Sequence, residues 1–185
     1  MPFPSFLDAC VLVPMPLADL LLRMAEADLY RPLWSEEVLD EVTRSLPKLG
    51  VTPLAAARRV KQMRDTFPDA AVPGCESLVS VMRNHPKDRH VLAAAVRANA
   101  ELIVTANLRD FPPDALDPYD IVAVQPDDFL LDQFDLYPED TLRCLREQVA
   151  ALREPPESMN AFLTQFAKTA PTFASAVRDH LDDRT

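Results

Sequence analysis

Short apolar runs alternate with amphipathic helical segments along residues 3–124, and this alternation constrains the fold more than any other feature of the chain. Residues 3–8 (FPSFLD) and 102–105 (LIVT) have the pattern of buried strands, and 121–124 (IVAV) that of a further strand. Strands that alternate with helices favour a parallel sheet with helices on both faces. Sites in such sheets lie beyond the carboxyl ends of the strands. We therefore expect an α/β fold with its functional site at that edge.

Helices are indicated by apolar residues at helical spacing and by residues that favour helix starts. Ser35 is a favourable N-cap, and Thr52 is a cap followed by proline at the first helical position. Pro14 and Pro16 interrupt the chain after the first strand. Residues 29–33 are expected to form a brief extended connection. A helix is expected after Ser35, with its buried stripe at 38–42, and another is expected to begin at Pro86. Further helices are expected at 16–27, 53–67 and 75–83.

The pattern changes after about residue 130, where only helical segments follow. These helices are expected at 138–153, 159–168 and 172–181, with Pro155-Pro156 as a break between the first two. We therefore expect an α/β domain over 1–130 and a small helical extension over 131–185. The apolar stripe of the extension indicates packing on its own domain, and a partner surface or a homodimer contact remains the alternative.

Acidic or amide residues stand at the edges of the apolar stretches: Asp8, Glu41, Asp88, Asn107 and Asp110. A buried carboxylate is costly unless something compensates it, and a divalent cation held by oxygen ligands would compensate several at once. Such a cation activates water and stabilises charge on a phosphate. The four carboxylates are therefore candidate catalytic residues, and Asp8, Asp88, Asn107 and Asp110 are candidate ligands of Mg²⁺ or Mn²⁺. The implied chemistry is cleavage of phosphodiester bonds.

The net charge of −10 and the pI near 4.7 count against a protein that binds nucleic acid. A bound cation would cancel part of this charge where a substrate phosphate would lie. Lys87 and Arg89 flank Asp88 and are candidates for holding the scissile phosphate, and Thr105 is a candidate for orienting a ligand or a water. Each has a structural alternative: a solvated helix face for the basic residues, and a buried backbone hydrogen bond for Thr105. We expect narrow substrate choice.

The composition is that of a soluble globular protein, with 48% hydrophobic and 26% charged residues. No apolar run is long enough to span a bilayer and the N-terminus lacks the features of a signal peptide, so we expect a cytoplasmic protein without a membrane partner. The cysteines, Cys10, Cys75 and Cys144, are far apart and odd in number, which indicates buried free thiols. His90 is expected to be a surface or half-buried histidine.

The segments FLDACVLV, SEEVLDEV and KDRHVLAAAVRANAELIVTANLRDF resemble the PIN domain of bacterial toxin-type (VapC-like) ribonucleases over roughly residues 3–130. The resemblance implies a parallel sheet flanked by helices, endonucleolytic cleavage of RNA that depends on Mg²⁺ or Mn²⁺, and inhibition by an antitoxin in a type II toxin-antitoxin system. It also implies that Asp8, Glu41, Asp88 and the Asn107/Asp110 pair surround and bind the metal.

The chain departs from the family pattern after Asp8, where Ala9 and Cys10 replace the frequent Asn or Ser, and at Asn107, where the family often has Asp. A haloacid-dehalogenase phosphatase would need a second aspartate at Cys10. A phosphate-loop NTPase is excluded because only Gly50 and Gly74 are present. The remaining alternative is a catalytically weak PIN-like module with a binding or regulatory role, which the acidic charge and Asn107 favour.

Overall fold

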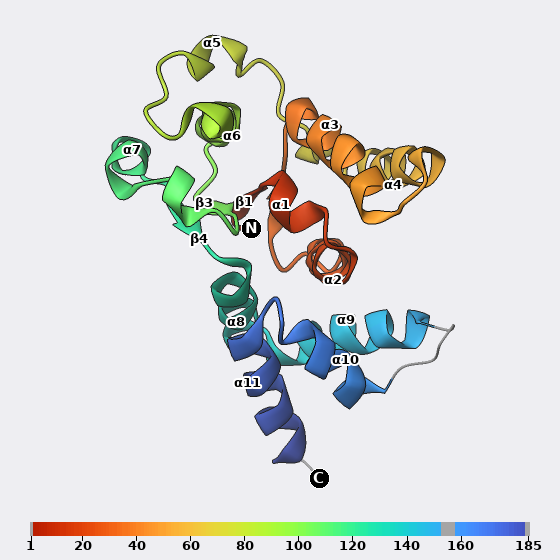
Figure 1. Ribbon diagram of the computed structural model, residues 1–185. Coiled ribbons are helices and arrows are strands. Elements are labelled where there is room, and N and C mark those ends of the chain that lie inside the picture. Colours follow the sequence, from red (N-terminus) through yellow and green to blue (C-terminus); the bar gives the residue numbers. More distant parts are fainter. Residues whose placement is uncertain (1, 153–157, 184–185) are drawn as a thin grey trace. The chain divides into compact units, whose positions relative to one another are not determined.

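The computed structural model describes residues 2–152 and 158–183 of the 185-residue chain (Figure 1). These residues form two compact units. The first contains the stretch that ends at Pro14 together with Tyr30–Val124, and the second contains Met15–Leu29 together with the chain from Gln125 onward. The second unit therefore begins earlier than the extension expected from residue 131 and includes an N-terminal helix.

A four-stranded parallel sheet forms the centre of the first unit, as the alternating pattern predicts. Its strand order is β2-β1-β3-β4, so that β1 pairs with both β2 and β3, and Phe6 of β1 lies between Leu33 and Ile103. The strands are β1 (Pro4–Leu7), β2 (Arg31–Leu33), β3 (Leu102–Val104) and β4 (Val122–Val124).

The two central strands are buried on both faces, which explains their nearly continuous apolar sequences. The chain leaves each of them at a polar residue. The backbone N–H of Asp8 still donates to the carbonyl of Val104 at 3.2 Å, and that of Thr105 donates to Val124 at 3.0 Å. Asp8 and Thr105 therefore lie side by side at the carboxyl edge of the sheet.

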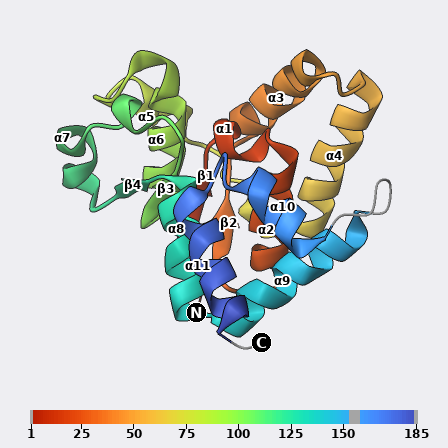
Figure 2. The same ribbon diagram turned by 60° about the horizontal axis from the view of Figure 1, so that its bottom comes forward.

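Helices flank this sheet on two sides. Figures 1 and 2 both show α5 and α6 on one flank and α3 and α4 on the other. The helices of the first unit are α1 (Ala9–Leu12), α3 (Glu36–Ser45), α4 (Pro53–Thr66), α5 (Glu76–Val79), α6 (Arg89–Arg97) and α7 (Pro113–Leu116). The 3-10 turns are η1 (Leu46–Leu49), η2 (Pro68–Ala70), η3 (Pro86–Asp88), η4 (Leu108–Asp110) and η5 (Asp117–Tyr119).

The capping residues act as the sequence predicts. The Ser35 hydroxyl accepts the N–H of Val38 at 3.3 Å at the start of α3, and the Thr52 hydroxyl accepts the N–H of Ala55 at 3.2 Å at the start of α4. The segment from Pro86 differs, because it first forms the 3-10 turn η3 and becomes α-helical only at Arg89. The expected helix over 75–83 is reduced to α5.

The regular elements in the described residues of the second unit are all helices (Figure 2). Leu17, Leu20 and Leu21 of α2 are buried, and α2 packs on α9. The amide of Gln148 in α9 donates to the carbonyl of Pro16 at 2.7 Å. These helices are α2 (Met15–Glu26), α8 (Pro126–Leu136), α9 (Pro138–Ala151), α10 (Met159–Phe166) and α11 (Pro171–Asp182).

Aromatic side chains fill the core of the second unit. The ring of Phe173 lies 6.0 Å from that of Phe134 and 5.9 Å from that of Phe166, measured between centroids. The helices expected after residue 137 are therefore present, and α8 is a further helix that the sequence interpretation missed. The expected break at Pro155-Pro156 lies outside the described residues.

All three cysteines are free thiols, as their number and spacing predict, and Cys75 and Cys144 are buried as expected, whereas Cys10 is only half-buried. Within residues 2–152 and 158–183, no helix is both long and apolar enough to cross a lipid bilayer.

Candidate functional site

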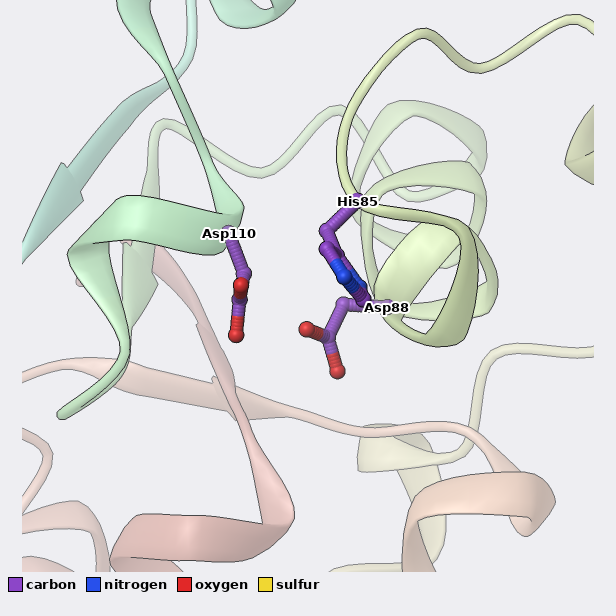
Figure 3. A group of neighbouring side chains, drawn as sticks. All are labelled: His85, Asp88 and Asp110. Atoms are coloured by element: carbon purple, nitrogen blue, oxygen red, sulfur yellow. The ribbon is translucent and has the colours of Figure 1, made fainter.

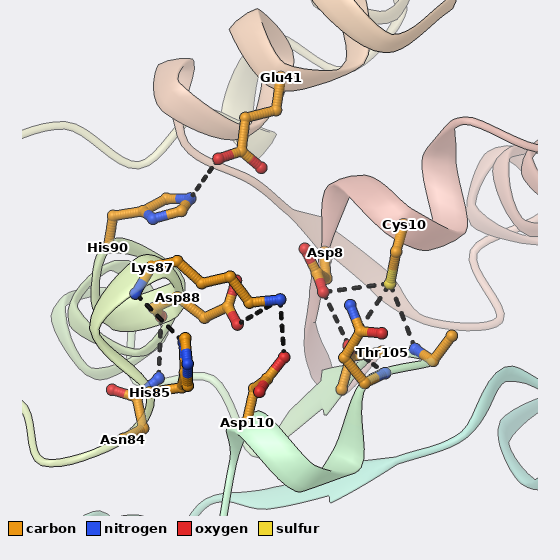
Figure 4. Close-up of polar contacts among 12 residues, drawn as sticks. Asp8, Cys10, Glu41, Asn84, His85, Lys87, Asp88, His90, Thr105 and Asp110 are labelled. Carbon is orange, nitrogen blue, oxygen red and sulfur yellow. Dashed lines mark hydrogen bonds and ion pairs between the residues drawn. The ribbon is translucent and has the colours of Figure 1, made fainter. Parts of the chain in front are cut away.

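A hollow of about 480 Å³ lies at the carboxyl edge of the sheet, and we call it the acidic hollow. Side chains from four separate parts of the chain line it: Asp8 after β1, Glu41 from α3, Lys87 and Asp88 from η3, and Asn107 after β3. Four of these were predicted to meet from their positions at element ends. The fold therefore gathers them from segments up to about 100 residues apart (Figure 4).

Asp8 is 4% exposed, and two donors hold its carboxylate. Its Oδ2 accepts the hydroxyl of Thr105 at 2.7 Å and the thiol of Cys10 at 3.1 Å (Figure 4). Burial, with a further contribution from Asp8, raises the pKa of the Cys10 thiol to about 12, so the thiol remains a donor at neutral pH. Thr105 is fully buried and also accepts the N–H of Asn107 at 3.0 Å. It contacts Asp8 and lies away from the surface.

A second cluster forms where η3 meets η4 (Figure 3). The potential ligand atoms of His85, Asp88 and Asp110 all lie within 4.8 Å of one another. The backbone N–H of His85 donates to the carbonyl of Asp110 at 3.0 Å and fixes the two segments together. His85 was not a candidate from the sequence, although its position three residues before Asp88 places both on one turn.

Lys87 is the cation of this cluster. Its ammonium lies 2.9 Å from Oδ2 of Asp110 and 3.6 Å from Oδ2 of Asp88, and its side chain is 57% exposed. The hydrogen bond from Lys87 lowers the pKa of Asp110. In this structure Lys87 therefore forms a close ion pair with Asp110 and a longer one with Asp88, and its single charge offsets only part of the charge of the two carboxylates.

Asp88 is only 8% exposed, and its Oδ2 has no hydrogen-bond partner. The Lys87 ammonium is too far away to form one. Burial raises the pKa of Asp88 to about 6, Lys87 opposes the increase, and Asp110 and Asp8 add to it. A buried carboxylate oxygen without a partner is costly for the folded state, so this oxygen has the environment of an atom that binds a cation.

Glu41 contacts a histidine of α6. Its Oε1 lies 3.4 Å from Nε2 of His90, and its side chain is 35% exposed. Burial raises the pKa of Glu41, the imidazole opposes the increase, and the charge of Asp8 adds to it. His90 itself is 7% exposed, so the expectation of a surface or half-buried histidine was wrong. The ring is buried because it points from α6 towards α3 and Glu41.

The remaining candidates differ in how closely they approach the cluster. Asp8 and Asn107 line the acidic hollow but lie outside the group formed by His85, Asp88 and Asp110. Asn107 is exposed. Arg89 does not line the hollow, and its Nε approaches the carbonyl of Asn84 at 3.5 Å. Lys87 is therefore the better placed of the two basic candidates.

The donor set fits a divalent cation. Carboxylate oxygens are the preferred ligands of Mg²⁺ and Mn²⁺, and the partnerless Oδ2 of Asp88 is available beside Asp110. Lys87 is long and largely exposed, so its ammonium can leave the carboxylates without unfolding any element. The hollow has space for an ion with its waters and a phosphate oxygen.

Comparison with known proteins matches both parts of the chain. Residues 5–109 match the family model described as "PIN domain", and residues 126–179 match the one described as "VapC50 C-terminal domain". A curated protein of Mycobacterium tuberculosis (strain ATCC 25618 / H37Rv), "Putative ribonuclease VapC50", is 51% identical over 105 residues. That alignment covers 57% of this chain and 62% of the relative's own length. No solved structure gave a significant match.

Proposed function

The chain belongs to the PIN domain family, and we propose on that premise that it is a metal-dependent endoribonuclease that acts as the toxin of a type II toxin-antitoxin system. The observation that carries the proposal is a buried carboxylate oxygen of Asp88 that has no hydrogen-bond partner. It lies beside Asp110, in a hollow that Asp8 and Glu41 also line. Such an arrangement is unfavourable by itself and becomes favourable when a cation is bound.

Asp8, Asp88 and Asp110 are proposed to hold Mg²⁺ or Mn²⁺, with Asn107 contributing its side-chain carbonyl. When bound, the ion lowers the pKa of a water and offsets the charge of the phosphate. Thr105 is proposed to orient the Asp8 carboxylate through its 2.7 Å hydrogen bond. The Cys10 thiol adds a second donor to the same oxygen and so serves where the family often has Asn or Ser.

Glu41 is proposed to accept a proton from the attacking water. The group must be ionised at the working pH, and a pKa raised by burial makes it a stronger base than an exposed glutamate. His90, whose Nε2 lies 3.4 Å from Oε1 of Glu41, is proposed to orient the carboxylate. Its place in the lining of the acidic hollow and its contact with His90 support this role for Glu41.

Lys87 is proposed to change partners during the reaction. Its exposed side chain spans from Asp110 to solvent, so it can transfer from the carboxylates to a substrate phosphate once a cation replaces it. Arg89 would first have to give up its approach to the Asn84 carbonyl, and its proposed phosphate contact is the weaker one.

The name of the mycobacterial relative refers to a ribonuclease, and by similarity we propose RNA as the substrate and an antitoxin as the partner. A second function, a catalytically weak PIN-like binding module, is favoured by the net charge of −10 and by the amide at Asn107. The two differ in whether the purified chain cleaves RNA when Mn²⁺ or Mg²⁺ is supplied.

The test is cleavage of a broad RNA panel by native protein and by Asp8→Asn and Glu41→Gln variants. We expect cleavage that needs Mn²⁺ or Mg²⁺, stops with chelator, and falls roughly 100-fold or more in both variants because a ligand or the base is lost. Asp40→Asn removes an exposed carboxylate from the same helix as Glu41 and should leave cleavage unchanged. Native protein that binds Mn²⁺ and cleaves no RNA would favour the binding module.

A further inference from the structure

We propose that His85 is a protein ligand of the cation held by Asp88 and Asp110, and that its imidazole makes the centre prefer Mn²⁺ over Mg²⁺. This inference rests on the proposed metal-dependent function and extends it to the choice of ion. His85 was not among the ligands expected from the sequence, and its role follows from the tertiary arrangement of η3 and η4.

The distances favour a shared ion. Two ligands on opposite sides of an ion bound at about 2.1 Å are about 4.2 Å apart, and neighbouring ligands are closer. The ligand atoms of His85, Asp88 and Asp110 lie within 4.8 Å of one another, so small rotations of the side chains suffice. The 3.0 Å hydrogen bond from the His85 N–H to the Asp110 carbonyl already holds the two backbones in place.

A second, independent observation points to a ligand at this position. Asp88 is buried, with 11% of its side chain exposed, its Oδ2 atom has no hydrogen-bond partner, and its carboxylate points into the space that His85 and Asp110 flank (Figure 3). The Lys87 ammonium lies beside the same space, 2.9 Å from Asp110. A cation therefore already occupies the point between the carboxylates, and a divalent ion would replace a monovalent one there.

His85 has one competing contact, which is weak. Its Nδ1 accepts the backbone N–H of Lys87 at 3.4 Å at the start of η3. Binding of a metal through Nδ1 uses the same lone pair, and binding through Nε2 requires the proton to move to Nδ1, so either mode ends this contact. A 3.4 Å hydrogen bond is long, and its loss costs little. The side chain is exposed and can turn towards the carboxylates.

The chemistry of the third ligand, the His85 imidazole, determines which ion the site prefers. Carboxylates and water serve Mg²⁺ and Mn²⁺ alike, whereas imidazole suits transition metals and adds little for Mg²⁺, which prefers oxygen. Asn107, an amide, is a weaker ligand than a carboxylate, so the site lacks one hard charge. An imidazole in its donor set therefore shifts the balance towards Mn²⁺.

The test compares the native chain with His85→Asn, which removes the imidazole and supplies a side-chain oxygen that can replace Nδ1 as the acceptor at the start of η3. Pulsed electron paramagnetic resonance of bound Mn²⁺ should show coupling to a ligand ¹⁴N nucleus in the native chain and lose it in the variant. Titration calorimetry with each ion should show a fall of about tenfold in the ratio of Mn²⁺ to Mg²⁺ affinity. His180→Asn, a histidine change in the second unit, should alter neither quantity.

The outcomes separate the two proposals. Bound Mn²⁺ without nitrogen coupling, or coupling that persists in His85→Asn, overturns the role of His85 even if the native chain cleaves RNA. An unchanged affinity ratio in the variant overturns the selectivity. A native chain that binds neither ion and cleaves no RNA overturns the proposed function and, with it, this inference.

Discussion

At the scale of single residues, the carboxylates in and beside the acidic hollow have different partners. Asp8 has two donors, Asp110 has Lys87, and the buried oxygen of Asp88 has no hydrogen-bond partner. The same ammonium that lowers the pKa of Asp110 fails to offset burial at Asp88, whose pKa rises to about 6. Without a divalent ion, ionisation of the Asp88 carboxyl therefore destabilises the folded state.

This difference makes the stability of the metal-free protein depend on pH. The folded-state pKa of Asp88 is about 6, above its ordinary value of 3.8, so the folded state binds this proton more tightly than the unfolded state. Binding of this proton stabilises the folded state fully at pH values below 3.8, the ordinary pKa, and this stabilisation is lost as pH rises through about 6. In chelator, Asp88→Asn should therefore have a higher Tm than the native chain at pH 7.5, and the gap should narrow at pH 5.

Thermal unfolding at the two pH values checks this prediction. Asp114→Asn removes an exposed carboxylate from the same unit and should leave the pH dependence as it is in the native chain. Saturating Mn²⁺ should stabilise the native chain more than Asp88→Asn, because the ion binds the ionised carboxylate. A gap between native and variant that is equal at pH 5 and pH 7.5 would contradict the assignment of a raised pKa to Asp88.

At the scale of elements, short segments position the site and capping residues fix where they start. The α3 helix carries Glu41 and begins at the buried cap Ser35, whereas α4 begins at the exposed cap Thr52 and contributes no residue to the acidic hollow. The guanidinium of Arg59 in α4 donates to the carbonyls of Leu12 and Val13 at the end of α1. Hydrogen bonds therefore fix the start of both helices, but only α3 carries a proposed catalytic residue.

The two caps offer a matched pair of variants. Ser35→Ala and Thr52→Ala should each lower the free energy of unfolding by about 1 kcal/mol, because each leaves one N-terminal N–H of a helix without its side-chain acceptor. Only Ser35→Ala should also reduce kcat for RNA cleavage, since it loosens the first turn of the helix that carries Glu41. Denaturant unfolding and single-turnover kinetics measure the two effects. Equal losses of kcat in both variants would indicate that α3 has no special role.

At the scale of the whole molecule, the two compact units do not follow the order of the chain. The α2 helix lies between strands of the first unit in sequence, yet it packs on α9 in the second. Its apolar stripe predicts a buried face, and the partner of that face is more than 100 residues away. The interior of the second unit therefore depends on both its early and its late segments.

A chain cut after residue 130 tests this dependence. It would keep α2 but lose α9, α10 and α11, which would expose Leu17, Leu20 and Met24, all now at most 2% exposed. We expect the shortened chain to bind a dye specific for apolar surface and to unfold at a lower temperature than the full chain. A shortened chain with native Tm and no dye binding would show that residues 1–130 fold as an independent domain.

The sequence by itself determined most of the elements and most of the candidate ligands. Strand runs ending at Asp8 and Thr105, the Ser35 and Thr52 caps, the parallel sheet and the free thiols all follow from composition, spacing and capping preferences. These are properties of neighbouring residues, so they can be predicted from a single chain. The set of acidic candidates followed in the same way, from their positions at element ends.

Only the tertiary structure decided which side chains meet. The hydrogen bond from Thr105 to Asp8 joins residues 97 positions apart, and His85, Lys87 and Asp110 come together because η3 and η4 share a backbone hydrogen bond. Packing between distant segments also grouped α2 with the C-terminal helices. No local preference encodes such contacts, because each depends on where the whole sheet and its helices bring remote parts of the chain.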